Sequence, residues 1–379
     1  MLKFSEQQEL LRKVVRDFVE KEIAPIAGKI DEEDTCPVEL LSMTARLGYN
    51  GVFTPAIYGG TGLGYTERAI ILEEIARYSA GFAMALMTHH LGVAAIQTWG
   101  NEEQKKKYLP KLCSGSVGGL AVTEQGGGSD FSGQKSTGKL VDGCWILNGR
   151  KCFITNSHCA DINIVTVKTG EDEKGRPVIS AVVIDENTPG CTPGRKEKKT
   201  GLRGSYLGEV VLNNVKVPEG NVLGKVGDGA KIALGTIGEV GRSGMAAIGL
   251  GILRACLEDS VKFSKERIIY GKPLAKLTNI QFIIAQNRID YEAGRLMTYN
   301  AVGMKDAGLP CTPEVAMAKY FTTEAAVNAA KRTTDLMGGY GVIYDYPVGR
   351  YLRDAVASIP SGGTSHVMQL VIAGSELKK

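Results

Sequence analysis

The stretch "CWILNGRKCFITN", residues 144–156, lies near the middle of the chain and reads as a β-strand. Three similar segments, rich in β-branched residues and separated by Gly, Pro and Asn, accompany it: "DINIVTVKT" (161–169), "VISAVVIDE" (178–186) and "GEVVLNNVKVP" (208–218). Such short segments between turn residues predict the strands of an antiparallel sheet or barrel.

Helical patterns flank this region on both sides. Ser5 and Gln8 fit a capping box, and apolar residues then recur at helical spacing from Leu10 to Val19. Helical patterns return from about residue 223 and continue almost to the C-terminus. The order helices, sheet, helices predicts an α+β chain with an N-terminal α-helical domain (1–118), a central β domain (119–222) and a C-terminal helical bundle domain (223–379).

Composition excludes several classes of protein. The 379 residues carry a net charge of +4, and no basic face or RNA-reading motif stands out, so we expect no nucleic-acid partner. The eight cysteines form no CxxC pair, so we expect no metal site. The N-terminus is charged from the start, and no run of eighteen apolar residues occurs. We therefore expect a cytoplasmic protein with reduced thiols and no membrane insertion.

Four segments could hold a ligand: "AVTEQGGGSD" (121–130), "KCFITNS" (151–157), "ERIIYGKPL" (266–274) and "DLMGGYGV" (335–342). Glycines let backbone N–H groups approach an anionic or planar ligand closely. Taken singly, each segment also has a plain structural interpretation: a surface turn, a strand end, an arginine at a helix C-terminus and a tight turn between helices.

In this order and spacing, however, the segments closely resemble the acyl-CoA dehydrogenase family. The resemblance covers nearly the whole chain and includes "YGGTGLGYTERAIILEEIAR" (58–77), "GNEEQKKKYLPKLCSG" (100–115), "KKTGLRGS" (198–205) and "YPVGRYLRDA" (346–355). It implies an N-terminal helical domain, a β domain and a four-helix C-terminal bundle, usually assembled as a homotetramer. It also implies FAD as cofactor, an acyl-CoA as substrate and an electron-transferring flavoprotein as electron acceptor.

The resemblance assigns FAD contacts residue by residue. Those expected at the flavin ring are Val122, Thr123, Gly128, Ser129, Phe153, Ile154 and Thr155. Those expected to reach the FAD of an adjoining subunit are Arg267, Tyr270, Gly338 and Gly339, and two more FAD contacts are expected at Thr364 and His366. The expected substrate contacts are Ser129, Glu239, Arg242, Ser361 and Gly363. Glu239 and Arg242 would lie along the CoA thioester, or else form an exposed helix ion pair at i,i+3.

The main departure from the family pattern lies in "SIPSGGTSHVM", residues 358–368. Gly362 stands where most relatives carry the glutamate that removes the substrate's α-proton. The backbone N–H there is expected to donate to the thioester carbonyl, and a glycine keeps that donor while it loses the carboxylate. Some relatives carry the glutamate just before the helix arginine instead, and that position is Gly241.

Three interpretations follow from the two glycines. In the first, another group is the base and the enzyme oxidises a cyclic or unsaturated acyl-CoA, with a 1,4-elimination as one route. "MALMTHHLG" (84–92) offers His89 and His90, and we favour His90 because it lies three residues after Met87 on the apolar side. Two histidines in a polar helix contact would look the same.

In the second interpretation, the flavin enzyme is a lyase that cleaves a β-substituent such as a sulfinate, which would need a cationic group near the leaving anion. In the third, the chain is an inactive subunit that binds FAD and acyl-CoA. We prefer the first, because the flavin and CoA features are kept and Met84 and Met87 suit a hydrophobic acyl group.

Overall fold

The computed structural model describes residues 3–130, 133–185 and 187–378. The first helix begins where the sequence predicts it. Ser5 Oγ accepts a hydrogen bond from the Gln8 N–H at 3.2 Å, and Gln8 Oε1 accepts one from the Ser5 N–H at 3.0 Å. The N-terminal helices are α1 (Glu6–Phe18), α2 (Ala27–Glu33), α3 (Val38–Arg46), α4 (Tyr65–Ala76), α5 (Ala80–Trp99) and α6 (Glu102–Ser114). A π turn (Val19–Ile23) and 3-10 turns (Ala24–Ile26 and Ala56–Tyr58) connect some of them.

The middle of the chain forms a sheet. Its strands are β1 (Gly118–Ala121), β2 (Thr137–Val141), β3 (Cys144–Thr155), β4 (Ile162–Glu171), β5 (Pro177–Ile184), β6 (Cys191–Lys196), β7 (Leu207–Pro218) and β8 (Val222–Leu223). They are hydrogen-bonded in the order β6-β7-β3-β2-β4-β5-β8, and β1 pairs with β4. The pairing is antiparallel as predicted, except that β1 and β2 each run parallel to β4. Along the chain, the β2–β3 hairpin separates β1 from β4. This connection is long enough for β1 and β4 to run parallel.

Strand residues alternate between two cores. Along β4, Ile162 and Ile164 join the large core formed with the helices, whereas Val165 and Val167 join a separate core within the β domain. This alternation follows from the two-residue period of a strand. It attaches one face of the sheet to the helices and holds the sheet in a fixed place relative to them.

The C-terminal part is a helical bundle built around one long helix. Its elements are α7 (Gly229–Thr236), a π turn (Ile237–Gly241), α8 (Arg242–Glu266), the small hairpin β9 (Ile268–Ile269) and β10 (Lys272–Pro273), α9 (Thr278–Asp306), α10 (Thr312–Met337), a 3-10 turn (Gly338–Val342), α11 (Val348–Ser358) and α12 (Ser365–Glu376). Short 3-10 turns also lie at Glu219–Asn221 and Leu274–Lys276. Among the described residues, Gly229–Glu266 is the one helical stretch apolar and long enough to cross a membrane, but 89% of its most apolar window is buried inside the protein.

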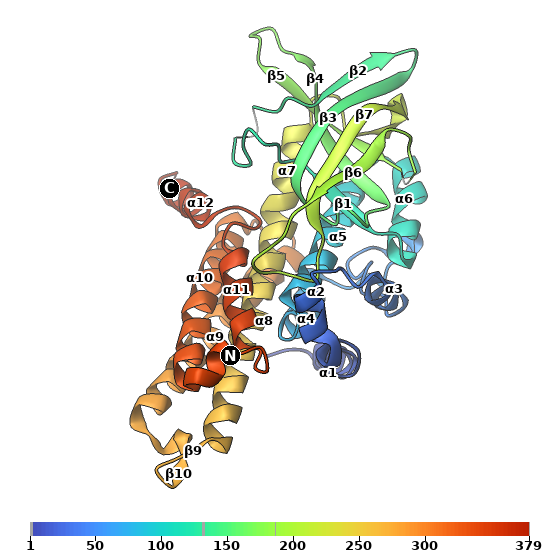
Figure 1. Cartoon of the computed structure of the whole chain (residues 1–379). Coiled ribbons are helices and arrows are strands. Elements are labelled where there is room, and N and C mark those ends of the chain that lie inside the picture. The colour runs from blue at the N-terminus through green and yellow to red at the C-terminus, as the bar shows by residue number, and fades with distance from the viewer. Residues whose placement is uncertain (1–2, 131–132, 186, 379) are drawn as a thin grey trace.

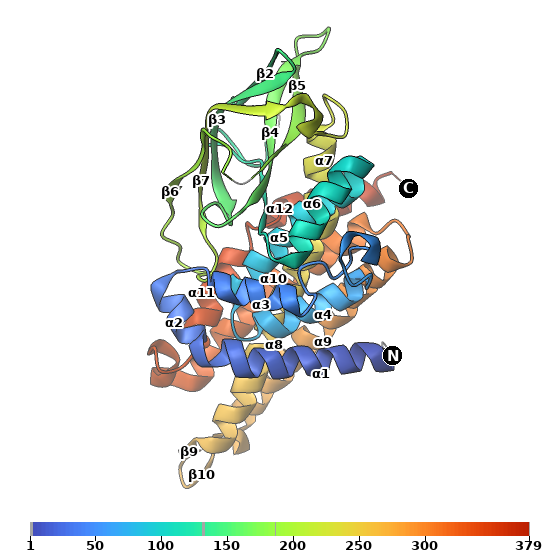
Figure 2. The ribbon, with the colours of Figure 1, turned by 90° about the vertical axis from the view of Figure 1, so that its right-hand side faces the viewer.

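The three parts stack along the bundle (Figure 1). The β domain sits at one end of α8, and the β9–β10 hairpin lies at the other end. The N-terminal helices pack along one side of the bundle, as the turned view in Figure 2 also shows. Helix α12 projects sideways from the end nearest the β domain. The N-terminal end of α8 is therefore where helices from all parts of the chain and the sheet come together.

Candidate active site

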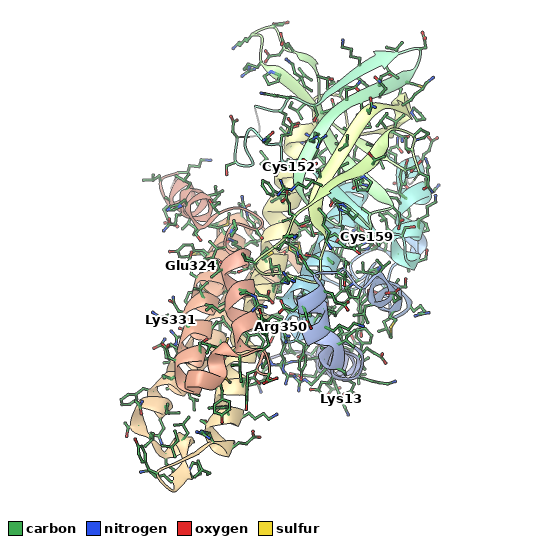
Figure 3. The ribbon with its side chains drawn as sticks, in the orientation of Figure 1. Lys13, Cys152, Cys159, Glu324, Lys331 and Arg350 are labelled. Carbon is green, nitrogen blue, oxygen red and sulfur yellow. The ribbon has the colours of Figure 1, made fainter. Side chains whose placement is uncertain are left out.

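The glycine-rich loop 121–130 is attached to strand β3. The backbone N–H of Cys152 donates a hydrogen bond to the Thr123 carbonyl at 2.9 Å. Figure 3 places Cys152 in the part of the β domain nearest the bundle. The next residue, Phe153, is 61% exposed and has a φ of 54°, an uncommon conformation for a residue with a side chain. An exposed aromatic ring held in this way next to a glycine-rich loop suits a planar ligand.

The other residues expected at the flavin ring fall into two groups around this contact. Val122, Ile154 and Thr155 are buried and support the loop and the strand end from within. Gly128 and Ser129 are exposed in the loop. The structure thus brings the two predicted flavin segments together, with Gly128 and Ser129 exposed on the loop and Phe153 exposed on β3.

A buried ion pair, which the sequence gave no reason to expect, fixes the loop. Lys151 Nζ donates to Glu124 Oε1 at 2.7 Å and to Gln134 Oε1 at 3.1 Å, and the Lys151 side chain is fully buried. Glu124 also accepts from the backbone N–H groups of Lys135, at 2.6 Å, and Ser136, at 3.1 Å. Burial alone would raise the pKa of the Glu124 carboxyl, but these donors, Lys151 first, hold that pKa below its usual value.

A second group of predicted residues meets at the far end of the bundle. Arg267, Gly338 and Gly339 line a pocket of about 410 Å³ together with Phe263, Ile269, Leu274, Leu336, Met337, Tyr340 and Ile343. The guanidinium of Arg267 lies 5.2 Å from the centre of the Tyr340 ring. A side chain at Gly338 or Gly339 would meet nothing within 4 Å, so both backbones face open space. Tyr270, at the hairpin turn, is 89% exposed.

The two groups are far apart within one chain. Helix α8 has 25 residues, and at about 1.5 Å of rise per residue it is roughly 37 Å long. The loop 121–130 lies toward its N-terminal end, and Arg267 follows its C-terminal end (Figure 1). One extended dinucleotide cannot reach both groups in a single copy of the chain.

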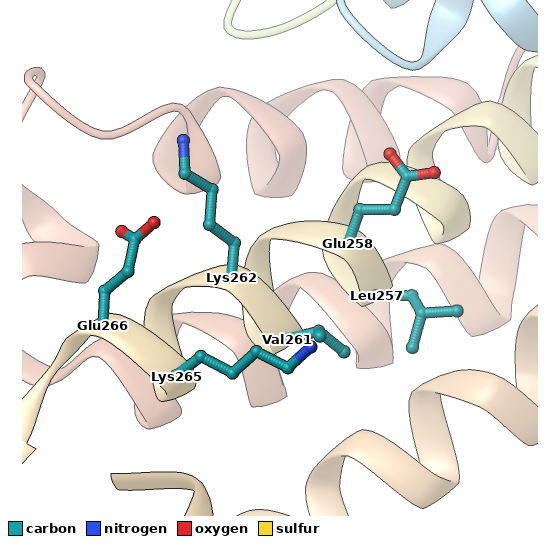
Figure 4. Close-up of a pocket in the computed structure, with 6 residues that line it drawn as sticks. All are labelled: Leu257, Glu258, Val261, Lys262, Lys265 and Glu266. Carbon is teal, nitrogen blue, oxygen red and sulfur yellow. The ribbon is translucent and has the colours of Figure 1, made fainter. Parts of the chain in front are cut away.

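Another groove on the bundle, of about 420 Å³, holds none of the predicted residues. It is lined by Leu257, Glu258, Val261, Lys262, Lys265 and Glu266 on the last turns of α8 (Figure 4). Its charged side chains are of both signs, so it offers no distinct charge to a ligand. We place the candidate active site elsewhere.

Gly362 lies against the backbone of Gly241 at the start of α8. A Cβ atom at Gly362 would lie 3.7 Å from the carbonyl carbon and oxygen of Gly241 and 3.2 Å from Cγ of Met245. A Cβ atom at Gly241 would lie 3.5 Å from Leu91, at ordinary van der Waals distance. Gly362 has a φ of +69°, which favours glycine, whereas Gly241 is in a helical conformation. The two positions thus share one space but differ in what their backbones allow.

Arg242 enters the same space without an ion pair. Its Nε atom is buried and has no hydrogen-bond partner among the described residues, and it lies 4.0 Å from where a Cβ of Gly363 would be. Burial lowers the pKa of Arg242. Glu239 does not pair with Arg242, as a helix ion pair would require, but with Lys305 of α9. A π turn, of a kind frequent at functional sites, ends where Arg242 begins α8.

Hydrogen bonds from α10 and within the loop itself hold the loop that carries Gly362 in place. Lys319 of α10 is fully buried, and its Nζ donates to the Ile359 carbonyl at 2.5 Å. Ser361 Oγ donates to the Ala357 carbonyl at 3.0 Å, and Thr364 Oγ caps α12 by accepting from the Val367 N–H at 3.3 Å. His366 is exposed on the first turn of α12. The hydroxyls of Ser361 and Thr364 thus shape the loop in this structure.

The geometry argues against the base expected at His90, and we no longer assign it that role. His90 is completely buried; its Nδ1 lies 3.2 Å from the Nε–H of Arg68, and its Nε2 lies 2.9 Å from the Tyr49 carbonyl. Since Arg68 can only donate and the carbonyl can only accept, the proton is on Nε2 and the lone pair on Nδ1 is occupied. His89 is held in the same way, by the Asn50 carbonyl at 3.1 Å and the Gly118 N–H at 3.0 Å. The alternative interpretation, two histidines in polar helix contacts, describes the structure.

Three family models match the chain in succession. They are the N-terminal domain of acyl-CoA dehydrogenase at residues 5–116, the middle domain at 119–215 and the C-terminal domain at 227–377. This chain belongs to the acyl-CoA dehydrogenase family. It has the family's fold and is an FAD-dependent oxidoreductase of the class that acts on CH–CH groups.

Relatives match this family member over its full length. An acyl-CoA dehydrogenase of Bacillus subtilis (strain 168) is 42% identical over 371 residues, which is 97% of both chains. A 3-(aryl)acrylate reductase of Clostridium sporogenes (strain ATCC 15579) is 38% identical over 378 residues, 99% of this chain and all of that protein. The relatives thus include both an enzyme named for dehydrogenation and one named for reduction.

Solved structures agree with the fold. The butyryl-CoA dehydrogenase of Megasphaera elsdenii superposes with a TM-score of 0.96 at 36% identity, with full coverage of both chains. A structure described as the electron transferring flavoprotein of Acidaminococcus fermentans gives a TM-score of 0.97 at 34% identity, again with full coverage of both. A glutaryl-CoA dehydrogenase of Mycobacterium smegmatis in complex with FADH2 gives 0.93 at 27% identity and covers 99% of this chain and 96% of that one.

The residues present fit FAD. The exposed ring of Phe153 beside the loop 121–130 offers a surface for a flavin. At the other group, Arg267 offers hydrogen-bond donors for phosphates, and the backbones of Gly338 and Gly339 are uncovered, so that a phosphate can approach them closely. Sequence reasoning found these residues. It missed Glu124, Lys151 and Arg68, because no short motif signals that a charge will be buried against another part of the chain.

Proposed function

We propose that this enzyme acts on the Cα–Cβ bond of a short acyl-CoA ester without a side-chain base at either usual position. The observation that carries the proposal is the contact between Gly241 and Gly362, where two backbones meet and neither residue offers a carboxylate. Bound FAD supplies a hydride acceptor or donor. The backbone N–H of Gly362 remains available to donate to the thioester carbonyl.

The loss of the base limits which substrates can react. A positioned general base is worth about 10²–10⁴-fold in rate, so saturated acyl chains with weakly acidic α-hydrogens are poor substrates for this site. Cyclic or unsaturated acyl-CoA esters have more acidic hydrogens and so depend less on a base. The reverse reaction, reduction of an enoyl-CoA, needs a proton at the α-carbon, and at this site solvent has to deliver it. Met245, buried beside Gly362, and Met87, buried against Gly244 three residues after Gly241, favour a short acyl group.

A second candidate function is the release of an anionic β-substituent without net oxidation. One observation favours it. The buried guanidinium of Arg68, on α4, donates to the carbonyl of Val240, the residue before Gly241. It is the kind of cation that this reaction needs, and the segment 84–92 of α5 offers only histidines.

We also propose a homotetramer in which each FAD is shared between two copies, with an electron-transferring flavoprotein as electron acceptor. The separation of the two FAD groups by the length of α8 supports sharing. Two apolar surfaces support an assembly of copies: α9 exposes Phe282, Ile289 and Leu296 at seven-residue spacing, and α12 buries Met368 but leaves Leu370 73% exposed.

The test uses the FAD-loaded enzyme under anaerobic conditions. It is mixed with a panel of saturated, unsaturated and cyclic short acyl-CoA esters, and flavin absorbance and product mass are both recorded; the prereduced enzyme is mixed with the enoyl esters. We expect flavin bleaching with unsaturated or cyclic esters, or reoxidation by enoyl esters, and little reaction with saturated ones. Product without a net flavin change identifies the second candidate. If no ester perturbs the flavin spectrum, the chain does not act on acyl-CoA.

A further inference from the structure

Arg68 is a buried arginine that no carboxylate neutralises. It is 1% exposed, and its hydrogen-bond partners are all neutral: His90 Nδ1 at 3.2 Å, Ser243 Oγ at 3.2 Å and the Val240 carbonyl at 3.0 Å. Within the described ranges, no acidic side chain forms an ion pair with it. Burial lowers the pKa of Arg68 to about 10, still well above neutral pH. The side chain therefore carries a full positive charge inside the protein.

The guanidinium lies directly behind the proposed acyl site. Its partners Val240 and Ser243 bracket Gly241 and Arg242 at the start of α8. A Cβ atom at Gly244 would lie 2.6 Å from the Arg68 guanidinium and 2.4 Å from Cγ of Met87, so the absence of a side chain at 244 makes room for both. Met87 and the Arg68 guanidinium thus both pack against α8 at Gly244, in the wall where we place the end of a short acyl chain.

Two further cations, Arg242 next to Gly241 and Lys319 against the segment before Gly362, form no ion pair within the described ranges. Arg242 has a buried Nε with no partner, and Lys319 donates to a backbone carbonyl. Burial lowers the pKa of Lys319 to about 8, so it is mostly charged at neutral pH. Of the nearby acids, Glu239 pairs with Lys305, whereas Glu324 of α10 (labelled in Figure 3) accepts from Ser365 Oγ at 2.5 Å and by its negative charge opposes the lowering of the Lys319 pKa.

Such an arrangement is costly in the absence of a ligand. A buried charge is normally paired, because removing it from water costs several kcal/mol that only a nearby opposite charge can offset. Arg68 bonds to α8 on both sides of Arg242, and Arg242 is near enough to Lys319 of α10 to lower its pKa, while Glu324 opposes that effect. An anion that entered beside Arg68 would be stabilised by its charge.

We propose that the acyl group of the substrate carries an anionic substituent, such as a carboxylate or a sulfinate, on its distal carbon, and that Arg68 is the residue that selects it. This inference rests on the proposed action on acyl-CoA esters. The selected chain is short, because the buried side chains of Met245, beside Gly362, and Met87, beside Gly244, fill the space along α8. Arg68 acts at the end of the acyl chain and leaves the thioester to the backbone of Gly362.

The test compares two four-carbon esters that differ at the distal carbon. Succinyl-CoA ends in a carboxylate and butyryl-CoA in a methyl group, and the CoA portion is common to both. Dissociation constants are measured on the FAD-loaded enzyme from the flavin difference spectrum and by calorimetry. We expect succinyl-CoA to bind about tenfold or more tightly, the effect of roughly 1.4 kcal/mol.

Variants then assign the preference to a residue. Arg68→Met should abolish the preference and leave butyryl-CoA binding within about twofold, whereas Arg68→Lys, which keeps a charge, should retain part of it. Ser243→Ala is the matched control: it removes a hydrogen-bond partner of Arg68 but no charge, and it should keep the preference. Bound flavin and the thermal midpoint are measured for each variant, so that a folding defect is recognised.

Each outcome bears on one claim. Equal binding of the two esters to the unchanged enzyme refutes the anionic substituent, whatever the variants do. A preference that survives in Arg68→Met, or an equal loss of both esters in a folded variant, removes Arg68 as the selecting residue. If neither ester nor CoA alone perturbs the flavin, the proposed function fails, which is a different result from equal binding.

Discussion

At the scale of single residues, the proposed site is defined by the missing side-chain carboxylate at Gly241 and Gly362. Gly241 and Gly362 lie side by side, but a side chain at Gly362 would be strained by a φ of +69° and crowded by Met245. A side chain at Gly241 would be in a helical conformation with only van der Waals contacts. Position 241 is therefore the place where this pocket can accept a carboxylate.

We predict that Gly241→Glu introduces the dehydrogenation of saturated short acyl-CoA esters and that Gly362→Glu does so poorly. The new carboxylate at 241 would regain up to about 10²–10⁴-fold in rate. Anaerobic flavin reduction measured by stopped flow with butyryl-CoA checks this. The double variant Gly362→Glu with Met245→Ala relieves the crowding and should react faster than Gly362→Glu alone. A folded Gly241→Glu enzyme with no gain would show that substrate does not lie between these two residues.

We predict that His90→Ala lowers stability more than activity. Loss of the imidazole leaves the Arg68 Nε–H and the Tyr49 carbonyl unsatisfied, at about 1–3 kcal/mol for a buried group. Urea unfolding measures the stability, and flavin reduction by the best substrate should change by less than tenfold. His89→Ala should behave similarly, because its ring also links two buried backbone groups. A slowing of 10² or more for His90→Ala alone, without loss of stability, would restore His90 as a base.

At the scale of elements, the flavin loop depends on strand β3. The loop 121–130 is polar and rich in glycine, so it has little shape of its own. The pair Glu124–Lys151 and the backbone bond between Cys152 and Thr123 attach it to the sheet. The exposed ring of Phe153 is oriented from the same strand.

We predict that Lys151→Met weakens both FAD retention and stability, because removing one partner of a buried ion pair costs about 3–5 kcal/mol. The paired change Glu124→Gln with Lys151→Met should recover part of the loss.

The folded-state pKa of Glu124 is depressed, so its contribution to stability is present above the ordinary glutamate pKa of about 4.3 and is lost as pH falls below it. Thermal midpoints from pH 3 to pH 7 for the wild type and Glu124→Gln check this. Their difference should shrink as the pH falls, and a constant difference would contradict the assignment.

At the scale of the whole molecule, the two groups of residues that we propose for FAD lie at opposite ends of one helix. Loop 121–130 and Phe153 are near the start of α8, and Arg267 with Gly338 and Gly339 is past its end. The exposed apolar residues of α9 and α12 are available to hold copies of the chain together. In our proposal, cofactor binding and assembly depend on each other.

We predict that Arg267→Ala reduces bound FAD and weakens the assembly together. The variant loses the guanidinium that would pair with the phosphates of a neighbouring copy's cofactor. Flavin-to-protein absorbance ratios and light scattering after size exclusion measure the two effects. Lys262→Ala, on the surface of the same helix outside that pocket, is the matched control and should change neither. Full flavin occupancy in an unchanged assembly would mean that Arg267 serves only as a helix-end charge.

Local patterns in the sequence determined the elements and much of the cofactor site. Three features depend on residues that are close in sequence and could therefore be predicted from it: the capping box at Ser5, the strand at 144–156 and the glycine-rich loop. Motifs in their order also led to Arg267 and the glycines beside it. What the tertiary structure alone decided is the electrostatics of the acyl site. Whether His90 is a free base or a hydrogen-bond acceptor depends on Arg68, which packs against it from another helix, and whether Arg68 is neutralised depends on residues about 170 positions away. The burial and pairing of a charged group are set by its neighbours in space. Its protonation state depends on these neighbours more than on the spacing of residues along the sequence.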